Sequence, residues 1–465
     1  MYTLLRNDAG NQSEILRHTL VIADKYLQNA HDGSPGVFVS DLPLDDVPLD
    51  GRGAINTLRL FETRYLNSIP YSTGPRYFGF VTGGSTPASL AADWLVSTFD
   101  QNTCCANDSI APQIERLTIH YMKQLFGLDP LAYGAFVTGA TMANFVGLAQ
   151  ARQWVGEQHG VDVAEDGLGS FPLKVLSGSA HSSIVKAMAM AGIGRRMLEP
   201  VPTLPGREAV DVSALEKVLR ACKQPVIVVA NSGTVNSGDF DDLEAIAALK
   251  DRHRFWLHVD AAFGGFAACS PQYAHLVKGL HHGDSVTVDA HKWMNVPYDT
   301  AMQFTRHPLL QLKIFRNSAS YLTDPEKSHD FFHFTPESSR RWRALPVWFS
   351  LQAYGKRGHA EIVERNCRLA RILARHIADS EEFELLNDVR LNIVCFTIRQ
   401  KGLESADIAA FLAAVRDDGI VYFTPTHYEG KPAIRAAISN WQTEERDIDI
   451  SVESLKRVFA RQKKE

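Results

Sequence analysis

The sequence predicts an α/β protein with a mostly parallel central sheet, an N-terminal helical segment and a small C-terminal α+β domain. The middle of the 465-residue chain alternates short β-branched runs with amphipathic helical patterns. These runs are apolar without strict alternation, which indicates strands covered on both faces and hence mostly parallel. The pattern changes near residue 345, so we expect three parts: residues 1–75, 76–345 and 346–465.

The N-terminal segment contains two helical patterns, from Glu14 to Leu27 and from Ile55 to Leu66. A stretch rich in Gly, Pro and Asp separates them. So few apolar positions do not make an independent core, and we expect this segment to pack on something else.

The central part contains five strand patterns, and amphipathic helical patterns follow the first three: "GAFVTG", "LKVLSG", "PVIVVANSG", "FWLHVDAA" and "SVTVDAHK". Ligands of such sheets bind beyond the carboxyl ends of the strands. The polar residues that end these patterns are therefore the candidates for a functional site.

The C-terminal part begins with a long helical pattern from Val347 to Ser380. The strand pattern "LNIVCFTIR", the helical pattern "SADIAAFLAAVRDDG" and the strand patterns "IVYFTP" and "AIRAAIS" follow, with a final helix from Asp449. This order is typical of a small α+β domain.

The composition limits the classes of function. The net charge is −5 and the basic residues form no long block, which gives nucleic-acid binding little support. No apolar run is long enough to span a bilayer, and the N-terminus lacks an apolar signal core. Six cysteines, of which only Cys104 and Cys105 are close together, favour neither a disulfide framework nor a metal site. We expect a cytoplasmic protein with no membrane or nucleic-acid partner.

The first three strand ends carry residues that have more than one interpretation. Gly139, Ala140 and Thr141 begin a helix, where free N–H groups and the helix dipole can bind an anion, although a simple N-cap also explains them. His181 opens the next helix, where a cap or surface residue is common. Thr234 follows the third strand, where Gly233 and Gly238 are typical of a turn.

The last two strand ends carry Asp260 and Lys292. A carboxylate in so apolar a context needs a charged partner, and apolar surroundings lower the pKa of a lysine and make its amine a nucleophile. A plain buried Asp–Lys ion pair is the simpler interpretation, but it does not explain the anion-binding loop and His181. Pyridoxal phosphate uses all of these parts: a Schiff-base lysine, a carboxylate on its ring nitrogen and an anion site for its phosphate.

Four motifs, "AHSSIVKA", "HVDAAFGG", "DAHKW" and "SRRWRALPVW", resemble the pyridoxal-phosphate-dependent group II amino-acid decarboxylases. This family includes aromatic-amino-acid, histidine and glutamate decarboxylases, and the resemblance runs from about Pro75 to the C-terminus. It implies the fold type I architecture, similar to aspartate aminotransferase. It also implies a homodimer with active sites at the interface and an N-terminal segment that wraps the partner.

The resemblance also implies roles for single residues. The implied catalytic residues are Lys292, which holds the cofactor as a Schiff base, Asp260 on the pyridinium nitrogen, and His181 stacked on one ring face. Further cofactor contacts are implied for Ala262 on the other ring face, for Thr234 near the polar edge of the ring, and for the phosphate ligands Gly139, Ala140, Thr141 and His291. The implied reaction is loss of CO2 from an L-amino acid to give the amine.

The identity of the substrate is less well defined by the sequence. Phe78, Phe80 and Phe99 favour an aromatic amino acid as substrate, although phenylalanine is more often a core residue. Gln101, Asn102 and Asp108 are suited instead to a polar or cationic side chain.

The sequence departs from the aromatic-acid branch of the family at Phe331. That position aligns with a loop tyrosine thought to protonate Cα, and phenylalanine has no proton to donate. Our hypothesis is that His333 or His181 supplies the proton. The alternative is an aldehyde synthase, in which the carbanion meets O2 and gives aldehyde, ammonia and peroxide. Tyr321 better matches a tyrosine that precedes the loop.

A second departure is Asp289, where the aromatic-acid branch often has Asn near the phosphate. Two anions would repel each other there, so we expect Asp289 to face His291 or another base. A pyridoxal-phosphate-binding paralogue without turnover is a further alternative, although the presence of His181, Asp260 and Lys292 argues against it. An aminotransferase also remains open, because it needs an arginine for the substrate carboxylate and Arg343 and Arg435 have no assigned role.

Overall fold

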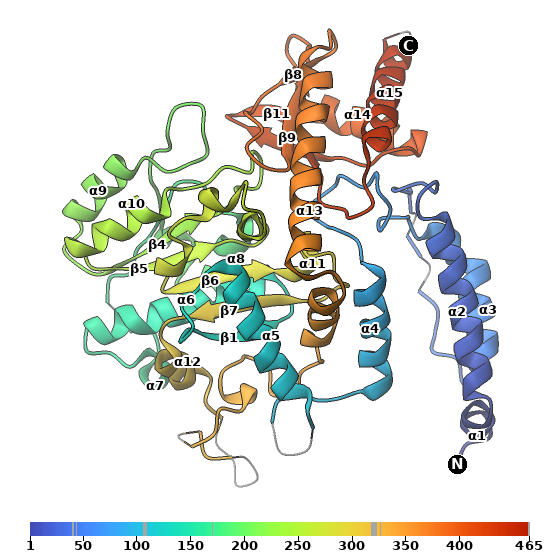
Figure 1. The fold of residues 1–465 in the computed structure, drawn as a ribbon, viewed down its shortest axis with the longest axis horizontal. Coiled ribbons are helices and arrows are strands. Elements are labelled where there is room, and N and C mark those ends of the chain that lie inside the picture. The colour runs from blue at the N-terminus through green and yellow to red at the C-terminus, as the bar shows by residue number, and fades with distance from the viewer. Residues whose placement is uncertain are drawn as a thin grey trace.

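The computed structural model describes residues 1–39, 41–42, 44–105, 109–169, 171–317, 323–325 and 327–463. Its centre is a seven-stranded sheet in the order β1-β7-β6-β5-β4-β2-β3 (Figure 1). The strands are β1 (Tyr133–Val137), β2 (Val175–Ser177), β3 (Leu198–Pro200), β4 (Val226–Asn231), β5 (Phe255–Asp260), β6 (Ser285–Asp289) and β7 (Ala301–Thr305).

The sheet is mostly parallel, as the apolar strand patterns predict. Strands β3, β2, β4, β5 and β6 are parallel neighbours, whereas β7 runs antiparallel to both β6 and β1. The sequence patterns did not reveal β3 and β7. β3 has only three residues, and β7 returns directly from the turn that follows "DAHKW".

Helices cover both faces of the sheet. α6 (Ala140–Gln158) lies across β5, β6 and β7, with α8 (Ser182–Met190) beside it. α5 (Ala111–Phe126), α4 (Pro87–Phe99) and the first part of α13 (Ala344–Ala378) pack together next to the sheet (Figure 1). The remaining helices of this part are α7 (Val163–Asp166), α9 (Val212–Ala221), α10 (Leu243–Ala248), α11 (Ala290–Trp293) and α12 (Pro308–Phe315).

The C-terminal part has its own core, formed by α13, α14 (Ser405–Asp418) and α15 (Glu445–Gln462) on a four-stranded antiparallel sheet. The strands of this sheet, in spatial order, are β10 (Thr424–Tyr428), β11 (Lys431–Ala437), β9 (Ile393–Ile398) and β8 (Phe383–Leu385). Two expected boundaries are corrected. The strand expected over "IVYFTP" begins only at Thr424, and the last helix begins before Asp449 because Glu444 and Asp447 form a capping box.

The N-terminal helices α1 (Thr3–Gly10), α2 (Gln12–Asn29) and α3 (Ala54–Arg64) lie along one side of the molecule and bury none of their residues (Figure 1). This agrees with the expectation that the segment has no core of its own. No helix among the described residues has the length and hydropathy needed to cross a bilayer.

Candidate active site

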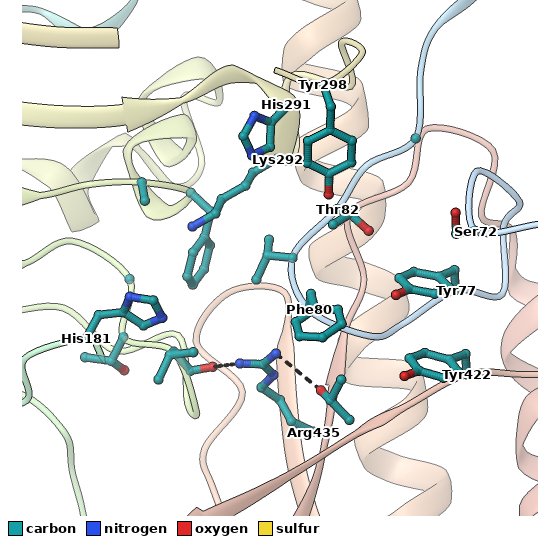
Figure 2. A pocket seen from close by; sticks show the side chains of 18 of the residues that line it. Ser72, Tyr77, Phe80, Thr82, His181, His291, Lys292, Tyr298, Tyr422 and Arg435 are labelled. Atoms are coloured by element: carbon teal, nitrogen blue, oxygen red, sulfur yellow. Dashed lines mark hydrogen bonds between the residues drawn. The ribbon is translucent and has the colours of Figure 1, made fainter. Parts of the chain in front are cut away.

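A cavity of about 930 Å³ opens beyond the carboxyl ends of β4, β5 and β6, next to the C-terminal sheet. Figure 2 shows its side chains, which come from the segment before α4, from the strand ends, and from the region of β10 and β11. Most of the residues predicted from the strand ends line this cavity: His181, Thr234, Asp260, Ala262, His291 and Lys292.

The predicted anion site lies behind the cavity wall. Gly139 is the N-cap of α6, and Gly139, Ala140 and Thr141 are not among the lining residues. A Cβ atom added at Gly139 would lie 3.5 Å from Cε1 of His291, so the helix start is next to a lining residue. Their role toward a phosphate stays a prediction.

Lys292 lies on the short helix α11, which follows β6 directly, so the strand end fixes where its amine points. Among the described residues no carboxylate is within ion-pair distance of its Nζ, and the simple Asp260–Lys292 ion pair is therefore absent. Nζ lies 5.9 Å from the ring centre of Phe263. Trp293 packs behind it, with its Nε1–H donated to Oδ1 of Asn366 at 2.8 Å.

Asp260 ends β5 and is 6% exposed. Each of its oxygens faces a donor: Oδ1 accepts the N–H of Ala262 at 3.2 Å, and Oδ2 accepts Nδ2–H of Asn144 at 3.1 Å. The carboxylate is therefore held in one orientation at the wall of the cavity.

His181 is the N-cap of α8, and its Nδ1 accepts the backbone N–H of Ser183 at 3.2 Å. Burial lowers the pKa of this imidazole, so the ring is neutral at pH 7. A neutral ring with an accepting Nδ1 carries its proton on Nε2. His181 therefore presents an N–H, not a cation, to a bound molecule.

Asp289 faces His291, as expected from the charge argument, with Oδ1 3.0 Å from Nδ1 of His291. Nδ1 of His291 accepts the N–H of Thr300 at 3.2 Å, and Oδ2 of Asp289 accepts the N–H of Ala140 at 3.0 Å. Burial raises the pKa of Asp289 to about 7 and lowers the pKa of His291 to about 4. Two acceptor atoms 3.0 Å apart repel each other unless one carries a proton, and the raised pKa lets Asp289 carry it.

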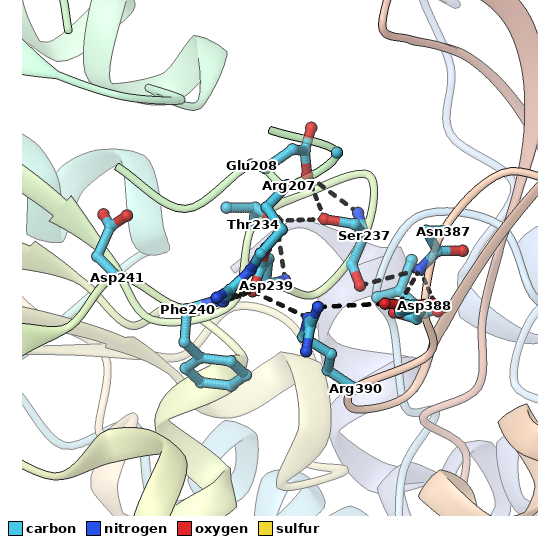
Figure 3. Close-up of polar contacts among 12 residues, drawn as sticks. Arg207, Glu208, Thr234, Ser237, Asp239, Phe240, Asp241, Asn387, Asp388 and Arg390 are labelled. Atoms are coloured by element: carbon cyan, nitrogen blue, oxygen red, sulfur yellow. Dashed lines mark hydrogen bonds and ion pairs between the residues drawn. The ribbon is translucent and has the colours of Figure 1, made fainter. Parts of the chain in front are cut away.

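The loop that holds Thr234 is clamped by its neighbours (Figure 3). Oγ1 of Thr234 accepts the N–H of Asp239 at 2.9 Å and lies 3.0 Å from Oγ of Ser237, which donates to Glu208. Asp239 in turn pairs with Arg207 at 2.6 Å and with Arg390 of the C-terminal part at 3.4 Å. The hydroxyl of Thr234 thus forms its hydrogen bonds within its own loop. This loop, held by hydrogen bonds and ion pairs, bounds the cavity on that side.

Several lining residues were not predicted from the sequence. Arg435 on β11 is 7% exposed and donates to the carbonyl of Val235 and to Oγ1 of Thr424, both at 3.2 Å, while its Nε has no partner among the described residues. Tyr77, Tyr298 and Tyr422 add phenols to the wall (Figure 2). The one available signal was the lone arginine within the apolar pattern "AIRAAIS".

Other residues considered from the sequence lie elsewhere. Phe78 belongs to the C-terminal core, Phe99 ends α4, and neither lines the cavity. Phe331 is 1% exposed in the main core, where the guanidinium carbons of Arg116 and Arg340 lie 5.3 and 4.9 Å from its ring centre.

The other residues near this loop and the polar substrate candidates do not line the cavity either. His333 is fully buried, with Nε2 bonded to the carbonyl of Thr323. Gln101 and Asn102 also lie outside the cavity, whereas Asp108 and Tyr321 lie outside the described residues.

The cavity fits pyridoxal phosphate. It holds a carboxylate fixed by two donors, together with a lysine that has no ion pair and a buried arginine whose Nε has no partner within the part of the chain that the structure describes. Of the described residues that line the cavity, Asp260 is the only acidic one, beside Lys292, Arg435 and two imidazoles, so an anionic molecule is favoured. A lysine and a carboxylate on neighbouring strand ends of a mostly parallel sheet agree with the fold type I architecture that the sequence resemblance implies.

Comparison with known proteins identifies the family. The model of the pyridoxal-dependent decarboxylase conserved domain matches residues 63–399, and the chain belongs to this family. It is 28% identical over 413 residues to an aromatic-L-amino-acid decarboxylase of Bacillus atrophaeus, covering 86% of this chain and 84% of that protein. It is 32% identical over 337 residues to an acidic amino acid decarboxylase of Mus musculus, covering 69% and 60%.

The solved structures agree on the fold. The Oryza sativa TDC structure with pyridoxal phosphate and tryptamine superposes with a TM-score of 0.89 at 20% identity, over 98% of each chain. The protein is thus a pyridoxal 5'-phosphate-dependent amino-acid decarboxylase, a carboxy-lyase.

Proposed function

We propose that the protein converts an aromatic L-amino acid into the amine and CO2. The observation that carries this proposal is Arg435, a buried cation in the same cavity as Lys292 with no carboxylate partner among the described residues. Burying a charge without a partner is costly, so the guanidinium is suited to bind the carboxylate of a substrate.

The rest of the wall suits an aromatic side chain. The rings of Tyr77 and Tyr422 stack with centroids 4.9 Å apart and planes 5° apart, and Phe80 lies beside them (Figure 2). If Arg435 binds the α-carboxylate and Lys292 the cofactor, no further lysine or arginine among the lining residues is left for an acidic side chain. An aromatic ring can instead pack on these rings.

The residues of the chain divide the chemistry among them. Pyridoxal phosphate, when bound, draws away the electrons that the departing CO2 leaves at Cα. Asp260 would stabilise a positive charge on the ring nitrogen of the bound cofactor, and Nε2–H of His181 would be available to donate a hydrogen bond to a molecule in the cavity. A neutral imidazole is a poor acid, so His181 and the buried His333 are weak candidates for protonating Cα.

Tyr298 is the better proton donor. Its phenol points into the cavity toward Thr82 (Figure 2), where desolvation raises its pKa although 62% of the residue is exposed, so it keeps its proton at pH 7. A donor from this position makes the amine the expected product even though Phe331 lies in the core. An aldehyde synthase would lack effective protonation at this step.

The N-terminal helices support a homodimer as the working form. They leave large apolar side chains exposed, including Leu16, Leu20, Val21, Leu27 and Phe61. An apolar surface of this kind is suited to a second copy of the chain. The proposed dimer places the active sites at the interface.

Variants of Arg435 test whether its guanidinium binds the α-carboxylate or a side-chain carboxylate of the substrate. We expect Arg435→Gln to lower kcat/KM for aromatic and acidic amino acids alike, by about 100-fold, because the α-carboxylate is common to both. Arg435→Lys keeps the charge and should restore part of the activity. A loss confined to acidic substrates would assign the guanidinium to a side-chain carboxylate and contradict the aromatic proposal.

A further inference from the structure

A chain of buried polar residues lies between α6 and strands β5 and β6, outside the residues that line the cavity. Asn144, His258, Ser285 and Trp256 are each at most 1% exposed. Each of them hydrogen-bonds to the next in this order. At Asn144 this network branches, and one amide group contacts both Asp260 and Ser183. The mechanism above gives none of these four residues a role.

The donors and acceptors fix the proton positions along this chain. Nδ2 of Asn144 donates to Oδ2 of Asp260 and to Oγ of Ser183, both at 3.1 Å, so its Oδ1 faces Nε2 of His258 at 3.0 Å. An amide oxygen only accepts, so Nε2 of His258 carries a proton. Burial lowers the pKa of His258 to about 4, which leaves the ring neutral.

The neutral ring of His258 determines the remaining bonds on this side. Its Nδ1 accepts, so the hydroxyl of Ser285 donates to it at 2.8 Å. Oγ of Ser285 in turn accepts the indole N–H of Trp256 at 2.9 Å. The position of each proton in this branch is therefore determined. If the amide of Asn144 flipped, it would lose its hydrogen bonds to Asp260 and to His258.

The second branch reaches His181. Because Oγ of Ser183 accepts from Asn144, its hydroxyl is free to donate to Nδ1 of His181 at 2.7 Å. This bond places the proton of His181 on Nε2, on the cavity side. One amide group therefore contacts the carboxylate and, through the hydroxyl of Ser183, reinforces the tautomer that the backbone N–H of Ser183 already favours.

The packing of α6 makes this contact possible. Gly147 lies one turn after Asn144, and a Cβ there would come within 2.6 Å of Cε1 and Nδ1 of His258 and 3.0 Å of Oγ of Ser285. A glycine inside a helix costs about 1 kcal/mol relative to alanine. Here it allows the helix to lie directly on His258.

We infer that Asn144 is a positioning residue of the cofactor site, held by His258, which orients the carboxylate of Asp260 and, through the hydroxyl of Ser183, helps the backbone N–H of Ser183 to hold His181 with its proton on Nε2. This inference rests on the decarboxylase function but not on the aromatic substrate. Asn144→Asp tests it, because this variant keeps the shape of the side chain and turns a donor toward Asp260 into an acceptor.

The readouts are the dissociation constant of pyridoxal phosphate, measured by titrating the apoprotein, and the pH dependence of the visible absorbance of the bound cofactor. We expect Asn144→Asp to weaken cofactor binding about ten- to hundredfold and to shift the absorbance pH profile. Gln150→Glu is the matched control, since Gln150 is also a fully buried amide of α6. It is bonded to Gln311 and does not belong to the hydrogen-bond network of Asn144. This variant should keep the cofactor affinity of the wild type.

Ser183→Ala removes the hydroxyl that lies between Asn144 and His181 and keeps the backbone N–H of residue 183 on Nδ1 of His181. It should leave cofactor affinity within about twofold while lowering kcat and shifting its pH profile. If Asn144→Asp does not fold by circular dichroism, His258→Gln is used in its place with the same expected loss of affinity. Wild-type affinity and absorbance profile in the folded Asn144 or His258 variant would overturn the inference. A wild-type protein that binds the cofactor normally and gives no CO2 from aromatic substrates would count against the substrate proposal instead.

Discussion

Replacing Asp289 by asparagine should remove a pH dependence of cofactor binding. Asp289 is 1% exposed and accepts the N–H of Ala140 at the start of α6, where the phosphate is expected. Burial raises its pKa to about 7, far above the ordinary value of 3.8. Below pH 7 the side chain is neutral and compatible with a neighbouring phosphate, whereas above pH 7 it adds a second negative charge.

The size of the effect follows from linkage. If only the neutral form of Asp289 accepts the phosphate, the dissociation constant rises about tenfold for each pH unit above 7, or about 30-fold at pH 8.5. We would titrate wild-type and Asp289→Asn apoprotein with pyridoxal phosphate between pH 6 and 8.5 by absorbance. The ratio of the two constants cancels the ionisation of the phosphate itself. A ratio that stays constant over this range would refute the reasoning.

Three further predictions concern other parts of the molecule. Tyr298→Phe should raise the ratio of aldehyde to amine among the products in air and lower the rate of amine formation at least tenfold, as measured by chromatography; an unchanged ratio and rate would exclude Tyr298 as the proton donor. Gly147→Ala should destabilise the apoprotein by about 2 kcal/mol in thermal unfolding, because the new methyl group meets His258; wild-type stability would show that α6 can shift freely. The intact chain should sediment as a dimer, and removal of residues 1–49 should weaken the dimer; a monomeric, active intact chain would contradict the proposed assembly.

Much of the fold was predictable because the central strands are short, apolar and each followed by a turn or helix signal. β7 was not, since five residues returning antiparallel beside β6 carry no pattern that distinguishes them from a loop. The start of β10 was misplaced for a related reason. The residues before Thr424 are apolar because they pack in the C-terminal core, not because they belong to the ladder.

The candidate site was predictable where a residue with a catalytic type of side chain directly follows a strand pattern. Asp260 and Lys292 follow apolar strands directly, so their neighbours in sequence already place them at one edge of the sheet. Arg435 reaches the same cavity from β11, and only tertiary packing brings it there. Phe331 shows the converse. Its alignment with the loop tyrosine located it in the sequence but gave no indication that the guanidinium groups of Arg116 and Arg340 would cover its ring in the core.

The most direct test of the proposed reaction is a product assay. Purified protein loaded with pyridoxal phosphate would be incubated in air with aromatic, acidic and basic L-amino acids, and CO2, amine, aldehyde and peroxide would be measured together. We predict that an aromatic amino acid gives CO2 and amine in equal amounts, with little aldehyde. CO2 matched by aldehyde and peroxide, CO2 from acidic substrates alone, or no CO2 from any of them would contradict the proposal.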